Sequence, residues 1–205
     1  MKNFIWDFDG TLFDTYPHTV TVLHRYMAER GRQYDYDALY AICREHMGKA
    51  RAFCKADEEE WDEFFRREAD INAPPFAGPY PGTENVLANV TAAGGRNFLY
   101  THRNAVSIKY LQKYDFVKYF TGFVTMENNF PQKPAPDAIL YLIGHFALNP
   151  EETLMVGDRE IDILSGKNAG VYTCLYMEGN PGALNTKADY TVENMAAFQA
   201  LFLES

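Results

Sequence analysis

Short apolar segments alternate with helical patterns along much of this 205-residue chain, and this alternation restricts the fold more than any other feature of the sequence. The apolar segments are Asn3–Phe8, Asn97–Thr101, Gly122–Met126, Thr153–Gly157, Tyr172–Tyr176 and, more weakly, Tyr190–Val192. Helical patterns with start and stop signals lie between most of them, at Gly82–Ala93, Ala105–Tyr114, Pro136–Phe146 and Glu160–Ala169. Strand–helix alternation of this kind predicts an α/β fold with a doubly wound parallel sheet.

One long interval, between the first strand and the second, breaks the alternation. It holds three helical patterns, at His18–Arg30, Tyr36–Met47 and Asp57–Ala69, and a proline-rich return at Ala73–Gly82. We therefore predict a core domain of residues 1–15 and 80–205 and an inserted all-α domain of residues 16–79. The alternative is that these helices merely flank the sheet. The insert has aromatic residues enough for a core of its own, which favours a separate domain.

Composition and charge restrict the partners. The chain has 19 basic and 28 acidic residues, a net charge of −9, whereas nucleic-acid binding needs clustered Lys and Arg. We therefore expect no nucleic-acid partner, while a small anionic substrate held by local donors stays compatible with the charge. No apolar stretch has the length needed to cross a bilayer, and Asp7 interrupts the N-terminal apolar run, so we expect neither a signal peptide nor a membrane partner.

The cysteines indicate the compartment. Cys43, Cys54 and Cys174 are odd in number and are spaced like neither a zinc site nor a disulfide framework. They are interpreted as reduced thiols, and we expect a cytoplasmic protein. The sequence is compatible with a monomer or a small homo-oligomer.

Two carboxylates follow the first apolar segment, in Phe4-Ile-Trp-Asp7-Phe-Asp9-Gly-Thr-Leu12. Buried strands are continuous apolar runs, and open α/β sheets place their sites at the C-terminal ends of such strands. Two acids at this position are costly unless a cation, usually a metal ion, compensates them. A turn capped by the two acids is the structural alternative, and their position directly after Trp6 disfavours it.

Three further polar features lie close to or directly after predicted strands. They are Thr101 followed by His102 and Arg103, Lys133 between prolines in Phe130-Pro-Gln-Lys-Pro-Ala-Pro136, and the pair Asp158 and Asp162. Because parallel strands end at one edge of a sheet, the fold brings these residues together with the first acids. Taken alone, Lys133 is typical of a solvated loop, and Thr101 fits a strand residue and a ligand equally well. Asp158 could be a helix N-cap, but the recurrence of an acid one turn later favours a site.

These residue types fit chemistry on a phosphate ester. One carboxylate can attack phosphorus, and a second can protonate the leaving oxygen and later deprotonate water. Grouped carboxylates suit Mg²⁺, which prefers hard oxygen ligands. A threonine hydroxyl beside a helix N-terminus and a lysine can bind the phosphate oxygens.

The four features, in this order, resemble the motifs of the haloacid dehalogenase superfamily over essentially the whole chain. The motifs are Asp7-Phe-Asp-Gly-Thr-Leu12, Thr101, Lys133 and Gly157-Asp158-x-x-x-Asp162. The helical insert between the first two resembles the type-one cap of phosphoglycolate phosphatase-like members. The resemblance implies a Rossmann-like core, with a mobile helical cap.

The resemblance also implies roles for individual residues. Asp7 would be the nucleophile and Asp9 the general acid and base. Mg²⁺ would be held by Asp7, the backbone carbonyl of Asp9 and Asp158, with Asp162 as a ligand through water or as an orienting residue. The phosphate oxygens would be bound by Thr101, His102 and Lys133. For His102 and Arg103 a backbone contribution is preferred over side chains that face the leaving group.

The insert carries a basic cluster at Arg44–Arg51, which reads as a loop around a glycine. In caps of this kind that region often reaches toward the site, so three residues are candidates for reading the non-phosphate part of the substrate: His46, Lys49 and Arg51. A solvated helix end balanced by the acidic stretch Asp57–Glu60 is an equal alternative.

We therefore expect a Mg²⁺-dependent phosphatase that hydrolyses a small phosphorylated metabolite through an aspartyl-phosphate. The resemblance makes Asp9 informative, because members that displace halide typically lack an acid there. The alternatives are a phosphomutase of the β-phosphoglucomutase kind and a non-catalytic regulatory protein that keeps the fold. Phosphoglycolate, a sugar phosphate, a nucleoside monophosphate and pyridoxal phosphate are all compatible with the sequence.

Overall fold

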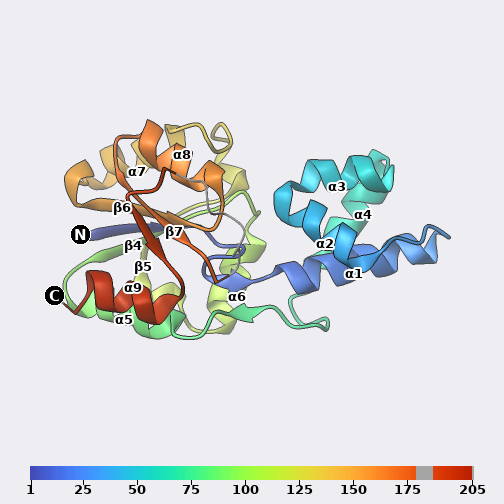
Figure 1. Ribbon diagram of the computed structural model, residues 1–205, viewed down its shortest axis with the longest axis horizontal. Coiled ribbons are helices and arrows are strands. Elements are labelled where there is room, and N and C mark those ends of the chain that lie inside the picture. Colours follow the sequence, from blue (N-terminus) through green and yellow to red (C-terminus); the bar gives the residue numbers. More distant parts are fainter. Residues whose placement is uncertain (179–186, 205) are drawn as a thin grey trace. The chain divides into compact units, whose positions relative to one another are not determined.

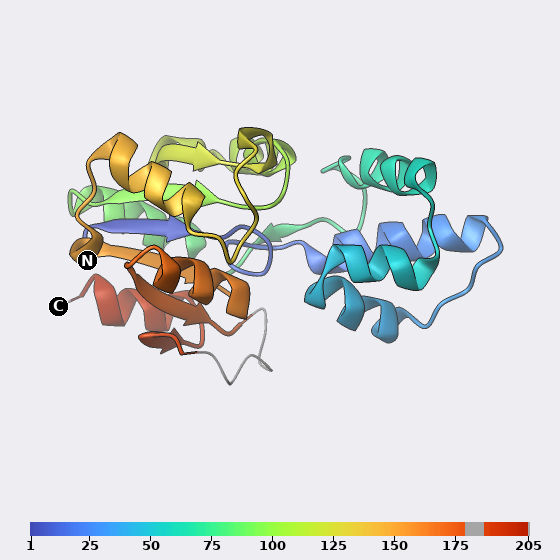
Figure 2. The ribbon, with the colours of Figure 1, turned by 90° about the horizontal axis from the view of Figure 1, so that it is seen from above.

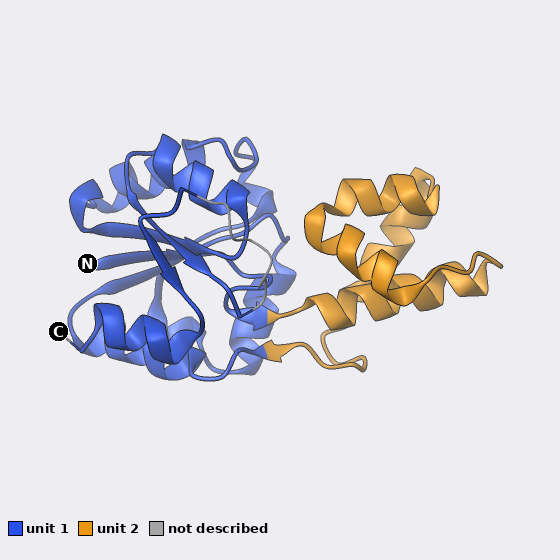
Figure 3. Ribbon diagram, viewed as in Figure 1, with its two compact units in different colours: residues 1–13, 79–205 blue, residues 14–78 orange. Residues whose placement is uncertain are grey.

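The computed structural model describes residues 1–178 and 187–204; residues 179–186 and 205, which the sequence assigns to the core, lie outside the described residues. The chain divides into two compact units, residues 1–13 with 79–205 and residues 14–78 (Figure 3). The sequence-based boundaries, after residues 15 and 79, lie within two residues of these. The chain passes between the units twice, and the two connecting segments pair with each other as the short strands β2 (Phe13–Asp14) and β3 (Gly78–Pro79).

The first unit is built on a parallel sheet. Its six described strands lie in the order β5-β4-β1-β6-β7-β8, and every pairing is parallel. The strands are β1 (Asn3–Trp6), β4 (Arg96–Tyr100), β5 (Phe120–Val124), β6 (Thr153–Gly157), β7 (Tyr172–Tyr176) and β8 (Tyr190–Val192). The predicted α/β class is confirmed, although β5 begins two residues earlier than predicted. Figure 2 shows β1 in the middle of the sheet, where the strand order reverses and α/β proteins place their sites.

Helices cover both faces of this sheet. They are α5 (Thr83–Ala92), α6 (Val106–Lys113), α7 (Asp137–Phe146), α8 (Glu160–Asn168) and α9 (Met195–Phe202). In Figure 1, α7 and α8 lie on one face and α5 and α9 on the other. Short 3-10 turns are η1 (Val117–Tyr119), η2 (Met126–Asn128) and η3 (Pro150–Glu152). This layering is that of a doubly wound fold.

The alternation of side chains along β1 joins the two layers. Ile5 packs with Phe98 and Met155 in the cluster that α7 covers. Phe4 and Trp6 face the other way and contact Phe198 of α9, with ring centroids 5.7 and 4.8 Å apart. Successive residues of a strand point to opposite faces, so a strand buried on both faces is apolar throughout. This burial anchors the strand that directly precedes Asp7.

The second unit consists of four helices. They are α1 (Tyr16–Glu29), α2 (Tyr36–Glu45), α3 (Met47–Cys54) and α4 (Glu58–Glu68). Its own core includes Leu23, Tyr26, Leu39 and Phe64. The loop predicted around Gly48 is wrong, because this segment is the start of α3. The ring nitrogen Nδ1 of His46 caps that helix by accepting the Gly48 N–H at 2.9 Å.

The three cysteines are buried, and none forms a disulfide in the part of the chain described. Burial raises the pKa of the Cys43 and Cys174 thiols to about 12 and that of Cys54 to about 11, so all three are unreactive at neutral pH. Among the described residues, no helix combines the length and apolar character needed to span a membrane.

Candidate active site

A tight turn after β1 presents two aspartates in different environments. The Asp7 N–H donates to the Val156 carbonyl at 2.9 Å, which continues the pairing of β1 with β6, and Asp7 is buried. The Phe8 carbonyl accepts hydrogen bonds from the N–H groups of Leu12 and Phe13. Gly10 has a φ of +81°, a conformation that residues other than glycine rarely adopt. The turn leaves the Asp9 side chain 20 % exposed. One acid is therefore fully buried, and the other is partly exposed.

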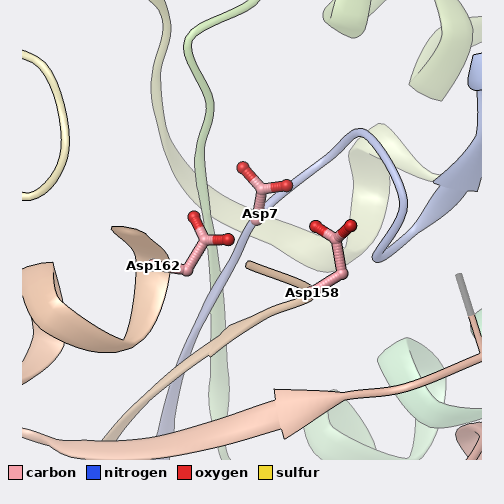
Figure 4. A group of neighbouring side chains, drawn as sticks. All are labelled: Asp7, Asp158 and Asp162. Atoms are coloured by element: carbon pink, nitrogen blue, oxygen red, sulfur yellow. The ribbon is translucent and has the colours of Figure 1, made fainter. Parts of the chain in front are cut away.

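Three buried aspartates meet where β1 and β6 end. One carboxylate oxygen of each of Asp7, Asp158 and Asp162 lies within 4.8 Å of the others, and Figure 4 shows the three side chains gathered at one point. Asp158 directly follows β6, and Asp162 lies in the first turn of α8. All three side chains are buried. The topology thus brings together the acids that the sequence singled out.

Gly157 makes room for one of these acids. A Cβ atom at this position would lie 2.3 Å from the Cβ and 2.6 Å from Oδ2 of Asp162, far inside van der Waals contact. The Oδ2 atom accepts the Arg159 N–H at 3.1 Å, which caps α8. Steric contact with Asp162 therefore explains why this position holds a glycine.

Lys133 supplies the positive charge of the cluster. Its Nζ atom lies 2.5 Å from Asp7 Oδ1, 2.7 Å from Asp162 Oδ1 and 3.0 Å from the Tyr100 carbonyl, and its side chain is fully buried. The ammonium donates hydrogen bonds to Asp7 and to the Tyr100 carbonyl, and its contact with Asp162 is an ion pair. The prolines around Lys133 hold the short loop from which it reaches the cluster.

The charges of the cluster shift one another's pKa values. Burial raises the pKa of Asp7 to about 6, although the Lys133 ammonium acts to lower it. Burial would also raise the pKa of Asp162, but Lys133 and Arg159 hold it below its usual range. Burial would lower the pKa of Lys133, and the carboxylates of Asp162 and Asp7 raise it above its usual range. Two of the buried acids, Asp7 and Asp162, therefore share the buried Lys133 ammonium, while Asp158 Oδ1 lies 4.0 Å from the Arg159 Nε atom.

This donor set fits a hard divalent cation. Within the described residues, the buried Oδ2 atom of Asp7 accepts no hydrogen bond, and the other two acids lie beside it. Uncompensated buried carboxylates are costly, and an oxygen-liganded ion relieves both the repulsion and the missing bond. The group consists of the side chains of Asp7, Asp158 and Asp162, and a contribution from the Asp9 backbone carbonyl stays a prediction.

The loop after β4 carries Thr101, His102 and Arg103. Thr101 is buried, and its hydroxyl oxygen accepts the Arg103 N–H at 3.0 Å, which leaves its own proton to donate. The Nε2 atom of His102 accepts the Lys133 N–H at 2.8 Å, so this nitrogen holds the lysine loop and carries no proton for a phosphate. The side chains of His102 and Arg103 both make hydrogen bonds, whereas the sequence favours a contribution from their backbone alone.

Arg103 is the residue that sequence reasoning undervalued. Its Nε atom donates to Asp9 Oδ1 at 2.8 Å, across 94 residues of sequence. The signal available in the sequence was an arginine two residues after the threonine of the second motif. Its partner depends on how the two loops meet.

The three basic candidates of the insert have local partners within the helical unit. His46 caps α3, Lys49 pairs with Glu45, and the Arg51 Nε donates to the Ala56 carbonyl at 3.2 Å. Their proposed role in substrate selection stays a prediction.

The whole arrangement has counterparts among known proteins. The family model for haloacid dehalogenase-like hydrolases matches residues 4–176, most of the chain. This protein therefore belongs to the haloacid dehalogenase-like hydrolase family.

Individual relatives agree with this assignment. A phosphoglycolate phosphatase of Aquifex aeolicus is 26% identical over 94% of this chain and 92% of its own, and the pyrophosphatase PpaX of Halalkalibacterium halodurans is 26% identical over 93% and 92%. The crystal structure of a hydrolase from Streptococcus pneumoniae TIGR4 is 31% identical, covers 84% of this chain and 92% of its own, and has a TM-score of 0.63. A HAD-superfamily hydrolase of subfamily IA from Geobacter sulfurreducens has a TM-score of 0.76 at 24% identity, over 98% and 96% of the chains, and supports the fold.

Proposed function

We propose that this protein is a Mg²⁺-dependent phosphatase that hydrolyses a small phosphomonoester through an aspartyl-phosphate on Asp7. The observation that carries the proposal is the buried cluster of three aspartates and Lys133 beside a more exposed acid, Asp9. This separates a nucleophile held next to a cation site from an acid that can exchange protons. Family membership and relatives named as phosphatases support the same reaction class.

The reaction proceeds in two steps. In the first, an oxygen of the Asp7 carboxylate forms a bond to phosphorus, the ester P–O bond breaks, and the leaving oxygen takes a proton from Asp9. In the second, Asp9 removes a proton from water as the water oxygen bonds to phosphorus. The bond to Asp7 then breaks, which releases inorganic phosphate and restores both acids.

The remaining residues bind and orient. Lys133 holds Asp7 and Asp162 in place, and the Thr101 hydroxyl and the backbone of its loop bind phosphate oxygens. Mg²⁺ fits at Asp7, Asp158 and the Asp9 carbonyl, with Asp162 beside it, and when bound it would offset the charge of the phosphate and of the cluster. The helical unit, residues 14–78, serves as a cap, and the paired segments β2 and β3 are its hinges.

The test is hydrolysis by the purified full chain. With Mg²⁺ it should release phosphate from 4-nitrophenyl phosphate, and Asp7→Asn should reduce kcat by at least about a thousandfold, because loss of a covalent nucleophile removes the first step. Arg66→Gln, an exposed arginine of α4 paired with Glu63, is the control and should retain activity. Activity of Asp7→Asn near the wild-type level, or full activity without a divalent ion, would exclude this mechanism.

The relatives indicate which substrates to compare first. They are named for phosphoglycolate and for pyrophosphate, at 26% identity in each case. A panel of phosphoglycolate, pyrophosphate, sugar phosphates and nucleoside monophosphates, read as released phosphate, ranks them by kcat/KM. Exchange of the phosphoryl group between two positions of one sugar, with slow phosphate release, would instead identify a phosphomutase.

A further inference from the structure

Arg103 makes an ion pair with the one acid of the site that lies outside the buried cluster. Its Nε atom is 2.8 Å from Asp9 Oδ1, and the two side chains are 11 % and 20 % exposed. A partly buried guanidinium–carboxylate contact of this length is a charge-assisted hydrogen bond that fixes the orientation of both groups. The contact joins the turn after β1 to the loop after β4.

The loop that carries Arg103 is itself held firmly. The Arg103 N–H donates to the Thr101 hydroxyl at 3.0 Å, and its carbonyl accepts the Met126 N–H at 3.1 Å. The next residues are also bound, since the Ala105 N–H donates to Glu127 Oε1 at 2.8 Å. Glu127 Oε2 in turn accepts the Thr125 hydroxyl at 2.6 Å. Both backbone polar groups of Arg103 are therefore used, and the guanidinium is presented from a fixed base.

We propose that Arg103 is a positioning residue that orients the Asp9 carboxyl so that its Oδ2 atom faces the leaving group. The inference rests on the proposed function and assigns a role within the same site. The Nε–H group is a permanent donor to Oδ1, and a hydroxyl oxygen is a poor acceptor from a cation, so a proton on Asp9 resides on Oδ2. Proton transfer then moves one proton from Oδ2 to the leaving oxygen as the P–O bond breaks.

The Arg103–Asp9 pair predicts how the rate of ester hydrolysis changes when Arg103 is replaced. A terminal carboxyl torsion is broad, so loss of the Arg103 contact widens the range of Asp9 orientations and includes more that miss the leaving oxygen. General acid catalysis contributes about 10²–10⁴-fold, and misplacement by about 1 Å costs on the order of 10²-fold. The loss falls only on esters whose leaving group needs the proton.

The experiment compares two aryl esters of the same shape. Phenyl phosphate releases a phenol with a pKa of about 10, which needs protonation, whereas 4-nitrophenyl phosphate releases a far better leaving group. For Arg103→Gln we expect kcat/KM for phenyl phosphate to fall about 10- to 100-fold and that for 4-nitrophenyl phosphate to fall less than about threefold. An equal fall for both esters would overturn the inference.

Two further measurements separate positioning from substrate binding and from a structural role. Inhibition by inorganic phosphate should keep its constant within about twofold in Arg103→Gln, and a tenfold rise would make Arg103 a phosphate ligand instead. In an Asp9→Asn background, Arg103→Gln should cause no additional loss, because residues that act through one group are not additive. An additional loss there would overturn the inference. Arg66→Gln is the charge-matched control, and thermal melting checks that each variant is folded.

The outcomes also distinguish this inference from the proposed function. A wild-type enzyme that hydrolyses neither ester would refute the proposed function, and the role of Arg103 would fall with it. An active wild-type enzyme whose Arg103→Gln variant keeps the same ratio between the two esters refutes the role of Arg103 alone.

Discussion

Replacing Lys133 by methionine tests the electrostatic account of the cluster directly. The side chain is fully buried, and its ammonium lies within 3.0 Å of two carboxylate oxygens and a carbonyl oxygen. Methionine fills a similar volume, so the change removes the charge and the hydrogen bonds with little loss of packing. Asp7 and Asp162 would then lack their buried counter-charge.

The expected cost is large for a single substitution. Removing one partner of a buried ion pair destabilises a protein by about 3–5 kcal/mol, because it leaves charge buried without a counterion. At about 2–4 °C per kcal/mol, for a chain of this size, the melting temperature of the metal-free protein should fall by roughly 6–20 °C at pH 7.5. Lys118→Met is the matched control. Lys118 lies in η1, is exposed, and pairs with Asp115 just before that turn. This substitution should leave the melting temperature nearly unchanged.

The pH dependence of this stability cost tests whether the Asp7 carboxylate causes it. The pKa of Asp7 is raised to about 6 in the folded protein, above its value of 3.8 in the unfolded chain, and loss of the lysine charge would raise it further. A carboxyl with a raised pKa binds its proton more tightly when folded, so its contribution to stability is present at low pH and is lost as the pH rises through the folded pKa. The cost of Lys133→Met should therefore be smaller at pH 5 than at pH 7.5.

The assay is urea unfolding of the metal-free protein at both pH values. It is followed by tryptophan fluorescence, to which Trp6 of the first unit and Trp61 of the helical unit both contribute. A cost below about 1 kcal/mol at pH 7.5 would refute the argument that buried charge dominates this site. An equal cost at both pH values would refute the assignment of the raised pKa to Asp7.

Two further predictions concern the same cluster. Binding of Mg²⁺ needs ionised carboxylates, so for the wild-type protein the rise in melting temperature on adding Mg²⁺ should be larger at pH 7.5 than at pH 5, and an equal rise at both would contradict a raised pKa for Asp7. Gly157→Ala places a Cβ atom 2.3 Å from that of Asp162 and should destabilise the protein by about 1–3 kcal/mol in urea unfolding, with reduced phosphatase activity. A Gly157→Ala variant with wild-type stability would show that the acid can move aside at no cost.

Much of the fold could be predicted because its signals are local. The strands β6, β7 and β8 have the predicted bounds, since each is an apolar run that stops at a polar or small residue. Helix α9 was missed for a local reason as well, because Met195–Phe202 is apolar on nearly every side and lacks an amphipathic pattern. Helix α3 is not predicted from the sequence, because histidine is an uncommon N-cap and Gly48 is a poor helix former.

The sequence by itself determined which residues meet at the edge of the sheet. Asp7, Asp158 and Thr101 each directly follow or end an apolar strand, and parallel strands in a doubly wound fold end at one edge. Periodicity and strand ends therefore suffice to place them. The identity of the family follows from the same local motifs and their order.

Only the tertiary structure decided which side chains pair within that edge. Three contacts join distant segments: Arg103 with Asp9, His102 with the Lys133 loop, and Lys133 with two acids at once. Their sequence separations run from 29 to 126 residues. Such contacts depend on strand register and on loop conformations fixed by many weak interactions together, which no local pattern encodes. The physical reason is that hydrogen bonds require placement within a few tenths of an ångström, whereas an apolar pattern specifies only a face.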